Sequence, residues 1–338
     1  MKQLPFPVDA VVEDVVGRVE LRLRYGSTVE QVSAKPLIVM TQRRRLDGLL
    51  AERAAAAGAE FRDGVRVTEV ACDTRGVMVE AGGRRFRAQA LIGADGANGI
   101  SARALGLCAQ PVYGVALEGN LPHSEIDAAR YRGRVVFELG SIRGGYGWIF
   151  PKGDHVNVGV GGSEREAPRL REHLRRLCRE HGVSDARLQD LRGHRLPCRR
   201  AGARLAIGRA LVVGDAAGLV DPLSGDGMYE AFISASLAAE ATLDVLAGRS
   251  PTLEPYEQRL KASLARLMAT SWAAKRALER FPFLLFTAAH AGFVQSALER
   301  LARGEPHPAA ARQFARVSFG VLNAVAGRRA DAVLLRAA

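Results

Sequence analysis

The stretch that decides the fold is GDAAGLVDPLSGDG, residues 214–227. Four apolar residues at 210–213 precede it and predict a buried strand, while the alanine-rich segment 228–246 behind it predicts a helix. Glycine-rich turns between a strand and a helix are where open α/β sheets bind their ligands. The sequence therefore predicts an α/β fold with a ligand site at this turn.

Five residues of this turn indicate what the ligand is. Asp215 directly follows the strand, where its carboxylate can accept hydrogen bonds from sugar or polyol hydroxyls, or alternatively from turn amides. Pro222 fixes a bend, and Gly225 and Gly227 leave backbone N–H groups open at a helix that begins near Met228. Such a helix N-terminus favours negative charge. We interpret Asp215 and the start of this helix together as a flavin site, with the acid on the ribitol chain and the helix end facing the pyrimidine edge.

The rest of the chain has a mixed α/β pattern around a central β segment. Residues 111–162 contain several β-like segments joined only by turns, which predicts a separate antiparallel sheet. Strand-turn-helix patterns lie on both sides of this segment, and nearly everything after Pro255 has helical spacing. The expected elements outside the sheet are a strand at 36–41, a helix closed by Gly58, strands at 65–73, 77–80 and 84–88, a strand-turn-helix unit at 89–106 and a helix at 166–182.

Three segments resemble the motifs of FAD-dependent oxidoreductases related to aromatic hydroxylases. GDAAGLVDPLSGDGMYEA (214–231) looks like their second flavin motif, and GADGANGISARALGL (93–107) resembles the companion motif, with Asp95 and Gly96 as its Asp-Gly pair. TQRRRLDGLLAERAAAAGAEF (41–61) is similar to their arginine-containing strand-to-helix segment. The resemblance implies that Arg43 reaches the FAD phosphates and ribose and that the backbone of Val67 reads the adenine.

The segment YGWIFPKGDHVNVGVGG (146–162) narrows the resemblance to the geranylgeranyl reductase family, which saturates double bonds of isoprenoid chains. Tyr146, Trp148, Phe150, Pro151 and Gly159 are in register with that family's signature. Alternate aromatic residues of a strand project onto one face, where they can form an apolar wall for a polyene. The alternative is a strand whose aromatic residues only fill the core.

The resemblance implies a particular domain organisation. We expect a Rossmann-like FAD-binding domain from residues 1–110 and 205–250, an inserted antiparallel β-sheet substrate-binding domain at 111–204, and a C-terminal helical region at 251–338. The family's opening strand, G-x-G-x-x-G turn and helix, and its Pro-x-x-Cys-Gly-Gly segment, are not found in this sequence. Our expectation is therefore an N-terminally truncated chain that lacks the first βαβ unit of the fold, which the genomic DNA before Met1 would test.

Composition excludes several classes of protein. The chain has 338 residues, 48% of them hydrophobic and 25% charged, and no apolar run approaches the roughly 18 residues that span a bilayer. The nearest run, 281–294, could line a prenyl channel, touch a membrane surface or form a buried core helix. Because the start does not resemble a signal peptide, we expect a cytoplasmic protein, with peripheral membrane contact as an option.

Charge and isolated reactive residues carry less information. The net charge is +12, and only five of the 48 basic residues are lysines, which suggests either an anion-seeking surface or a codon bias toward arginine. No arginine cluster is interleaved with aromatic residues, so we expect no nucleic acid partner. The four scattered cysteines predict reduced structural thiols without a metal. His155, His194 and His290 look isolated, and the sequence assigns no proton donor.

The expected function is an FAD-dependent oxidoreductase that reduces C=C bonds of a geranylgeranyl-type chain on a lipid, quinone or pigment precursor. NAD(P)H, another reductant or an electron-donor protein would supply the electrons. Two alternatives stay open at this point: a flavin-dependent aromatic monooxygenase or halogenase-like enzyme, and a non-catalytic remnant that binds lipid or a partner.

Overall fold

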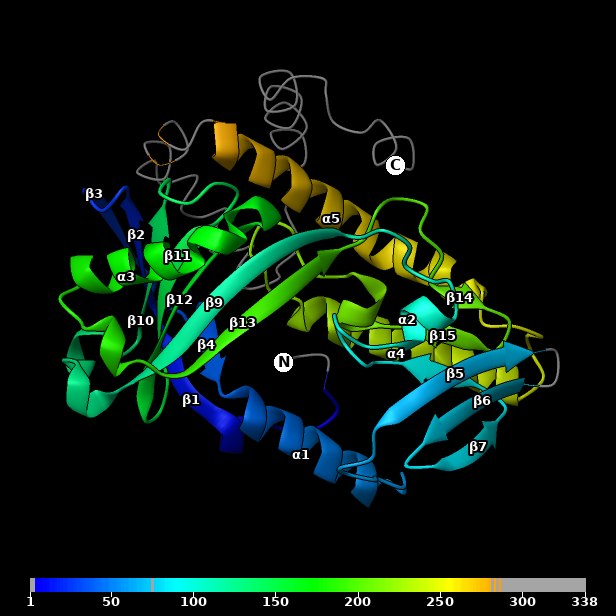
Figure 1. Ribbon diagram of the computed structural model, residues 1–338. Helices are drawn as coiled ribbons and strands as arrows, with labels where there is room; N and C mark the ends of the chain where they lie inside the picture. The colour runs from blue at the N-terminus through cyan, green and yellow to red at the C-terminus, as the bar shows by residue number, and fades with distance from the viewer. Residues whose placement is uncertain (1–3, 74–75, 281–282, 284–285, 287–338) are drawn as a thin grey trace. The chain divides into compact units, whose positions relative to one another are not determined.

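The computed structural model describes residues 4–73, 76–280, 283 and 286 (Figure 1). Its residues group into two compact units. The first unit contains the chain up to Phe61, the segment Val115–His194 and the helical residues that begin at Ala273. The second contains Arg62–Gly114 and Arg195–Trp272. Each unit is described by itself below.

The first unit is built on a seven-stranded sheet in the order β13-β9-β12-β11-β10-β2-β3. Strands β10, β11 and β12 pair antiparallel, whereas β10 and β2 run parallel, with Arg134 opposite Arg18 and Leu139 opposite Leu23. A two-stranded sheet of β1 and β4 and the helix α1 complete this part of the chain. The bounds are β1 Val12–Val16, β2 Arg18–Leu23, β3 Ser27–Val32, β4 Ile38–Thr41, α1 Arg43–Ala56, β9 Val112–Pro122, β10 Arg134–Leu139, β11 Tyr146–Pro151, β12 His155–Ser163, α3 Leu170–Glu180 and β13 Gln189–Cys198.

Helix α3 covers one face of this sheet. Its leucines recur every three or four residues, at Leu170, Leu174 and Leu177, and all three are buried together with Ile149 of β11 and Val158 of β12. Along β11 the residues of this face, such as Ile149, are buried, while the alternate residues are half-buried. The two faces of β11 are thus distinct, and its aromatic residues occupy the face that α3 does not cover.

The second unit contains two three-stranded sheets. In the sheet of order β14-β15-β8, β15 runs parallel to β8, with Ala210 opposite Leu91 and Val212 opposite Gly93. The other sheet joins β5, β6 and β7 as an antiparallel meander. The bounds are β5 Val67–Asp73, β6 Gly76–Ala81, β7 Arg84–Ala88, β8 Leu91–Gly93, α2 Ser101–Ala104, β14 Ala206–Ile207, β15 Ala210–Val212, α4 Met228–Leu246 and α5 Pro255–Arg280.

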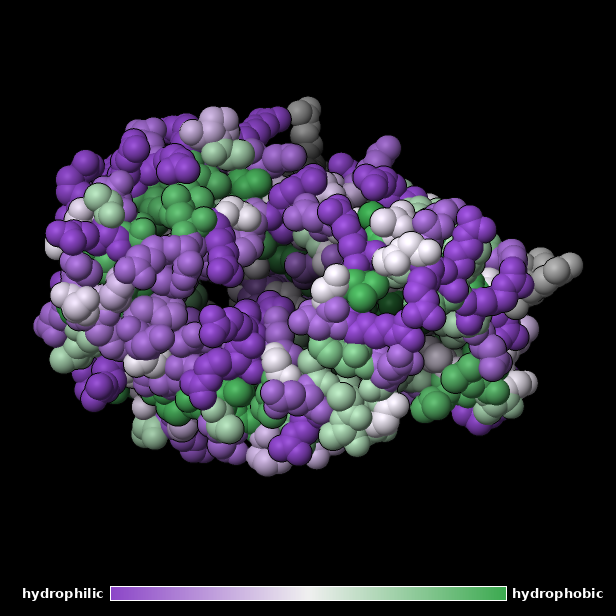
Figure 2. Space-filling model, turned by 60° about the horizontal axis from the view of Figure 1, so that its bottom comes forward, coloured by the Kyte–Doolittle hydropathy of each residue, from purple (hydrophilic) through white to green (hydrophobic). Residues whose placement is uncertain are grey.

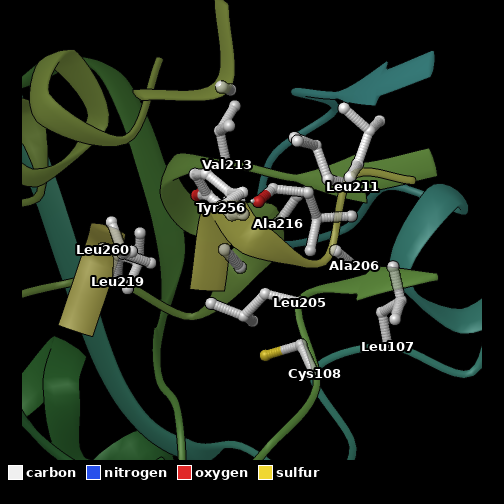
Figure 3. Close-up of a cluster of buried hydrophobic side chains, with 14 of the residues drawn as sticks. Leu107, Cys108, Leu205, Ala206, Leu211, Val213, Ala216, Leu219, Tyr256 and Leu260 are labelled. Carbon is white, nitrogen blue, oxygen red and sulfur yellow. Dashed lines mark hydrogen bonds between the residues drawn. The ribbon is translucent and has the colours of Figure 1, made fainter. Parts of the chain in front are cut away.

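A buried apolar cluster holds β15, the turn after it and the first part of α5 together (Figure 3). Tyr256 is fully buried in this cluster, and its hydroxyl donates a hydrogen bond to the carbonyl of Val212, 3.2 Å away. The carboxylate of Glu257 accepts the backbone N–H groups of Leu205 and Ala206 at 2.6 and 3.0 Å. These contacts fix the strand from which the glycine-rich turn departs.

Most predicted elements are present with shifted ends, and α4 has the predicted bounds. The first 61 residues differ from the expectation. We placed residues 1–110 in the FAD-binding domain, but the chain up to Phe61 groups with the antiparallel sheet, because β2 and β3 extend that sheet beside β10. The helix expected at 166–182 begins as a 3-10 turn and is α-helical only over Leu170–Glu180.

The surface is largely hydrophilic on the face shown in Figure 2, with apolar residues exposed in patches between hydrophilic ones. No helix within residues 4–73 and 76–280 is long and apolar enough to span a membrane. The run 281–294 lies almost wholly outside the described residues, as does His290. All four cysteines are free, and three of them are buried.

Candidate functional site

The glycine-rich turn leaves β15 through a short 3-10 segment, Gly214–Ala217. Gly214 and Gly218 both have positive φ, at 53° and 66°, and a Cβ on Gly218 would come within 2.9 Å of the Arg199 nitrogen. The backbone N–H of Gly214 donates to the Ser234 hydroxyl of α4 at 3.1 Å. This arrangement places the half-buried Asp215 in the turn that follows β15 along the chain, as the sequence predicts.

The loop between this turn and α4 is closed by Asp221. The buried Asp221 carboxylate accepts the N–H groups of Leu223 and Ser224 at 3.0 and 2.8 Å. The backbone N–H of Asp221 donates to the Asp226 carbonyl at 2.8 Å. Pro222 is buried at the bend, and Gly225 has a φ of 68° that favours glycine. The loop therefore returns the chain to the start of α4 beside Asp215.

Asp215 and Gly227 lie next to each other. A Cβ on Gly227 would be 3.0 Å from Asp215 Oδ1, and it would touch Val220 at an ordinary contact distance of 3.5 Å. Glycine at 227 thus keeps the space beside the carboxylate open. The predicted pairing of an acid with a helix N-terminus is present in the geometry.

The amides at this helix end are not bare, which corrects the sequence-based expectation. Gly227 and Met228 both donate their N–H groups to Asp226 Oδ1, at 2.8 and 3.1 Å. An aspartate beside a helix start commonly takes this capping role, because the first amides of a helix have no partner within it. That these amides face a flavin stays a prediction, and any ligand here meets the exposed Asp226 carboxylate as well.

Glu230, in the first turn of α4, is a titratable group that the sequence analysis did not single out. Its side chain is buried, and burial raises the pKa of Glu230 to about 7, with a further contribution from the carboxylates of Asp221, Asp226 and Asp215. The residue is therefore partly protonated near neutral pH. In the sequence, the glycines that precede Glu230 and the acidic residues near it are the features that could have identified it.

Asp95 serves the turn that joins β8 to α2. Asp95 Oδ2 accepts the N–H groups of Ile100 and Ser101 at 2.7 and 2.8 Å, and the Ser101 hydroxyl donates to Oδ1. Gly96 follows with a φ of 75°, and a Cβ on Gly99 would overlap the Asp95 carboxylate. In this structure the carboxylate shapes the turn, and its contact with FAD stays a prediction.

The remaining predicted FAD residues lie at the ends of elements. Val67 begins β5 in the second unit, and its side chain is exposed. Arg43 begins α1 in the first unit, where its exposed guanidinium forms an ion pair with Asp47 at 3.0 Å. The structure thus brings Asp215 and Gly227 into contact, while Arg43 belongs to the other unit.

The predicted aromatic row exists on the face of β11 opposite α3. Tyr146, Trp148 and Phe150 are successive residues of this face, with ring centroids 5.9 and 6.1 Å apart. Phe137 of β10 adds a fourth ring, 5.5 Å from Tyr146 and 5.4 Å from Phe150. Pro151 is buried on the other face. The four half-buried rings form one continuous aromatic surface, which we call the aromatic face.

Gly159 explains how Trp148 fits onto the sheet. The two residues are direct cross-strand partners, and a Cβ on Gly159 would overlap the Trp148 ring. A Cβ on Gly161 would come to 3.5 Å from the same ring. The indole therefore lies over a strip of glycine backbone, which accounts physically for the spacing between the aromatic residues and the glycine.

A polar network extends from the aromatic face toward the β13 edge of the sheet. Trp148 Nε1 donates to Asn157 Oδ1 at 2.8 Å, and Asn157 also bonds the Glu118 carboxylate. Glu118 Oε1 lies 2.9 Å from His194 Nε2. The expectation that His194 is isolated is therefore wrong, and so is that for His155, whose Nδ1 contacts Asp154 at 2.6 Å. Sequence separation hid both Glu118 and Asn157.

Glu118 and His194 shift each other's pKa toward the charged form. Its hydrogen bond to Glu118 raises the pKa of His194 above the usual value, against the effects of burial and of Arg192 and Arg43. Burial alone would raise the pKa of Glu118, but the hydrogen bonds from His194 and Asn157 and the nearby Lys152 lower it.

Comparison with known proteins decides the family. Residues 9–271 match the family model described as an FAD binding domain. The chain belongs to this family. This FAD binding domain is 31% identical over 260 residues to a chloroplastic geranylgeranyl diphosphate reductase of Oryza sativa subsp. japonica, covering 72% of this chain and 55% of the relative. It is 29% identical over 278 residues to a digeranylgeranylglycerophospholipid reductase of Methanocaldococcus jannaschii, covering 75% and 67%.

Solved structures agree on the fold. A geranylgeranyl bacteriochlorophyll reductase-like protein of Thermoplasma acidophilum superimposes with a TM-score of 0.70 at 24% identity, covering 81% of this chain and 74% of the other. The flavin-dependent brominase Bmp2, as a triple mutant, gives a TM-score of 0.69 at 18% identity, covering 93% and 84%. The chain spans about half the length of several curated relatives that it matches.

Proposed function

We propose that this protein is an FAD-dependent oxidoreductase that reduces C=C bonds in a geranylgeranyl-type chain carried by a lipid, quinone or pigment precursor. The observation that carries the proposal is the aromatic face on β10 and β11, in a chain of the FAD binding domain family. The names of its relatives, which reduce geranylgeranyl diphosphate and digeranylgeranylglycerophospholipid, support this substrate class.

The residues around α4 fit the flavin end of FAD. Asp215 offers a half-buried carboxylate for the ribitol hydroxyls, and glycine at 227 keeps a Cβ away from that carboxylate. Gly227 and Met228 would face the pyrimidine edge, with Pro222 and Gly225 shaping the approach. When bound, FAD supplies the hydride for alkene reduction.

Four residues would hold the other parts of FAD. The backbone of Val67 is proposed for the adenine, and Arg43 with the Asp95–Gly96 turn for the phosphates and ribose. Asp95 would act mainly by holding the turn, since both of its carboxylate oxygens already accept hydrogen bonds from that turn and α2.

The aromatic face would bind the prenyl chain. Tyr146, Trp148 and Phe150 present ring surface without charge, Gly159 leaves room for the Trp148 ring, and the buried Pro151 ends the strand. Binding a polyene there buries apolar surface, and each Å² removed from water stabilises the complex by roughly 25 cal/mol. It also excludes water from the reacting bond.

Electrons would come from NAD(P)H, another reductant or an electron-donor protein. Because a prenylated lipid resides in a membrane, we also propose peripheral contact with a membrane surface for substrate uptake. Net charge of +12 favours anionic lipid over neutral lipid in such a contact.

Anaerobic turnover tests the proposal. The chain is loaded with FAD, reduced with dithionite without oxygen, and mixed with geranylgeranyl diphosphate, and the products are read by mass spectrometry. We expect two hydrogen atoms to be gained for each bond reduced. Turnover that requires oxygen would instead indicate a monooxygenase or halogenase-like enzyme, and a chain that does not take up FAD would indicate a binding protein.

A further inference from the structure

Helix α3 and the turn that joins β10 to β11 border a hollow that has no part in the proposed function. Its volume is about 270 Å³, below the roughly 300–1,000 Å³ of pockets for drug-sized molecules, so it suits a small group. Ser141 lines it from the turn, and the helix side contributes four arginines: Arg169, Arg175, Arg176 and Arg179. All of these residues belong to the first unit, in which α3 covers the sheet face opposite the aromatic face (Figure 1).

The arginines line this hollow because the two sides of α3 differ in sequence. Residues 169, 172, 173, 176 and 179 recur every three or four positions and therefore share one side of the helix. The leucines at 170, 174 and 177 recur in the same way one position further along, and they pack against the sheet. The four arginines are exposed, so a ligand can reach their guanidinium groups from solvent.

The lining arginines have weak partners. Arg179 forms no ion pair with a residue that the structure describes. The ion pairs of the other three are long, 3.4–4.0 Å: Arg169 with Glu166 and Glu172, Arg175 with Asp185, and Arg176 with Glu180. Ion pairs of exposed arginines contribute little to stability, and a doubly charged anion can replace them. Among the described residues that line the hollow, Glu172 is the only acid, so positive charge is in excess there.

The Arg176 end of the hollow is ordered by contacts within the protein. The Arg176 guanidinium lies over the Tyr25 ring, 4.6 Å from its centre, and the Tyr25 side chain interacts with Ser141. The turn itself is fixed by Lys275, whose Nζ donates to the Gly144 carbonyl at 2.5 Å. Groups that are ordered before binding lose less conformational freedom when a ligand arrives.

We propose that this hollow binds a phosphate group, carried by an anionic phospholipid headgroup or present as a free phosphate ion. Guanidinium groups match the oxygens of phosphate with paired N–H donors, and the Ser141 hydroxyl adds a further donor. If the ligand is a phospholipid, α3 is the part of the first unit that touches the membrane. The proposal involves neither FAD nor an alkene and therefore stands apart from the proposed function.

The test uses the full chain without FAD and two probes. Inorganic phosphate is titrated by calorimetry, and phosphatidylcholine vesicles, with and without phosphatidic acid, are tested by cosedimentation. The double variant Arg176→Gln/Arg179→Gln removes two lining charges, and Glu172→Gln removes the acid. The matched control is Arg85→Gln/Arg87→Gln, which removes the same charge from two exposed arginines of β7 in the second unit that also form ion pairs.

We expect the double variant to weaken phosphate binding by about tenfold or more, because two charge-assisted hydrogen bonds are lost. Glu172→Gln should strengthen binding by about threefold, since its carboxylate repels the anion. The control should stay within about twofold of the wild type. Binding to phosphatidic acid vesicles that follows the same order and that phosphate competes away identifies the lipid headgroup as the ligand. Phosphate binding without vesicle binding identifies the free ion.

The site is wrong if the wild type binds neither probe, or if the double variant loses no more affinity for them than the control does. If circular dichroism shows that the double variant does not fold, Glu172→Gln decides, and an unchanged or weaker affinity contradicts the proposal. A wild-type chain that binds phosphate as expected but takes up no FAD refutes the proposed function and leaves this site standing.

Discussion

At the scale of single residues, contacts on two sides hold the Trp148 side chain in place. Glycine backbone lies beneath its ring, and Asn157 fixes the indole N–H at 2.8 Å. A half-buried indole with a satisfied N–H is a rigid platform, since rotation would leave the Asn157 oxygen without its donor. The rigidity of the aromatic face therefore depends on Gly159 as much as on the aromatic residues.

Replacement of Gly159 by alanine tests this dependence. The added Cβ overlaps the Trp148 ring, so we expect the free energy of unfolding to fall by about 1–3 kcal/mol in urea titration. The emission of Trp148, measured in a Trp272→Phe background, should shift to longer wavelength as the ring leaves the sheet. Gly48→Ala is the control: nothing lies within 4 Å of its Cβ position in α1, so stability should not fall. Unchanged emission in Gly159→Ala would contradict the account.

Asp226 allows charge and hydrogen bonding to be separated. Asp226→Asn keeps an oxygen that can accept the Gly227 and Met228 amides but removes the charge, so bound FAD should become easier to reduce in a spectroscopic titration. Asp226→Ala should in addition cost about 1 kcal/mol of stability through loss of the cap. Asp63→Asn, at another exposed aspartate that bonds the next residue's amide, should leave the reduction potential unchanged. A potential insensitive to Asp226→Asn would place the flavin away from this helix end.

The Glu118–His194 pair makes stability depend on pH in a defined direction. The pKa of His194 is raised in the folded state, so its stabilisation is present below about pH 6.5 and is lost as pH rises through the folded value. The pKa of Glu118 is lowered, so its contribution is lost as pH falls through its own folded value. Urea unfolding should therefore show a larger stability gap between wild type and Glu118→Gln at pH 6 than at pH 8.5. An equal gap at both values would mean that the pair carries no charge interaction.

At the scale of elements, the sequence predicts best where one periodic pattern fills a whole element. Helix α4 has the predicted bounds because a glycine-rich turn ends directly before a long alanine-rich segment. The strands β2 and β3 are not among the predicted elements, although RVELRL (18–23) alternates clearly between polar and apolar residues. The parallel pairing of β2 with β10 depends on long-range register that no local pattern contains.

Candidate-site residues follow the same rule. Asp215 and Gly227 were predictable because the motif is continuous in sequence, whereas Glu118, Asn157 and His194 come from three strands and meet only in the folded sheet. The glycines at 225 and 227 predict an open helix end, but the side chain of Asp226 between them accepts the Gly227 and Met228 amides.

The start of α5 offers a test of how the second unit is held together. Glu257 accepts two backbone N–H groups at the start of β14, those of Leu205 and Ala206. Glu257→Ala leaves both donors buried without a partner, and the free energy of unfolding should fall by about 1–3 kcal/mol. Glu257→Gln retains an oxygen that can accept and should lose less. Equal losses for the two variants would show that charge, not acceptance of the amides, is what matters there.

At the scale of the whole molecule, the family assignment and the site chemistry converge. The FAD binding domain match covers residues 9–271, which includes every residue proposed for FAD and for the prenyl chain. The folds of a reductase-like protein and a brominase superimpose about equally well, so fold alone does not separate their chemistries. Relatives in sequence and the aromatic face favour reduction of an isoprenoid.

The measurement that tests this claim most directly is anaerobic, single-turnover reaction of the reduced, FAD-loaded chain with geranylgeranyl diphosphate, followed by absorbance and mass spectrometry. We predict that the flavin absorbance returns without oxygen and that the prenyl product gains two hydrogen atoms for each flavin reoxidised. Flavin that stays reduced until oxygen is admitted, with the prenyl chain unchanged, would contradict the account.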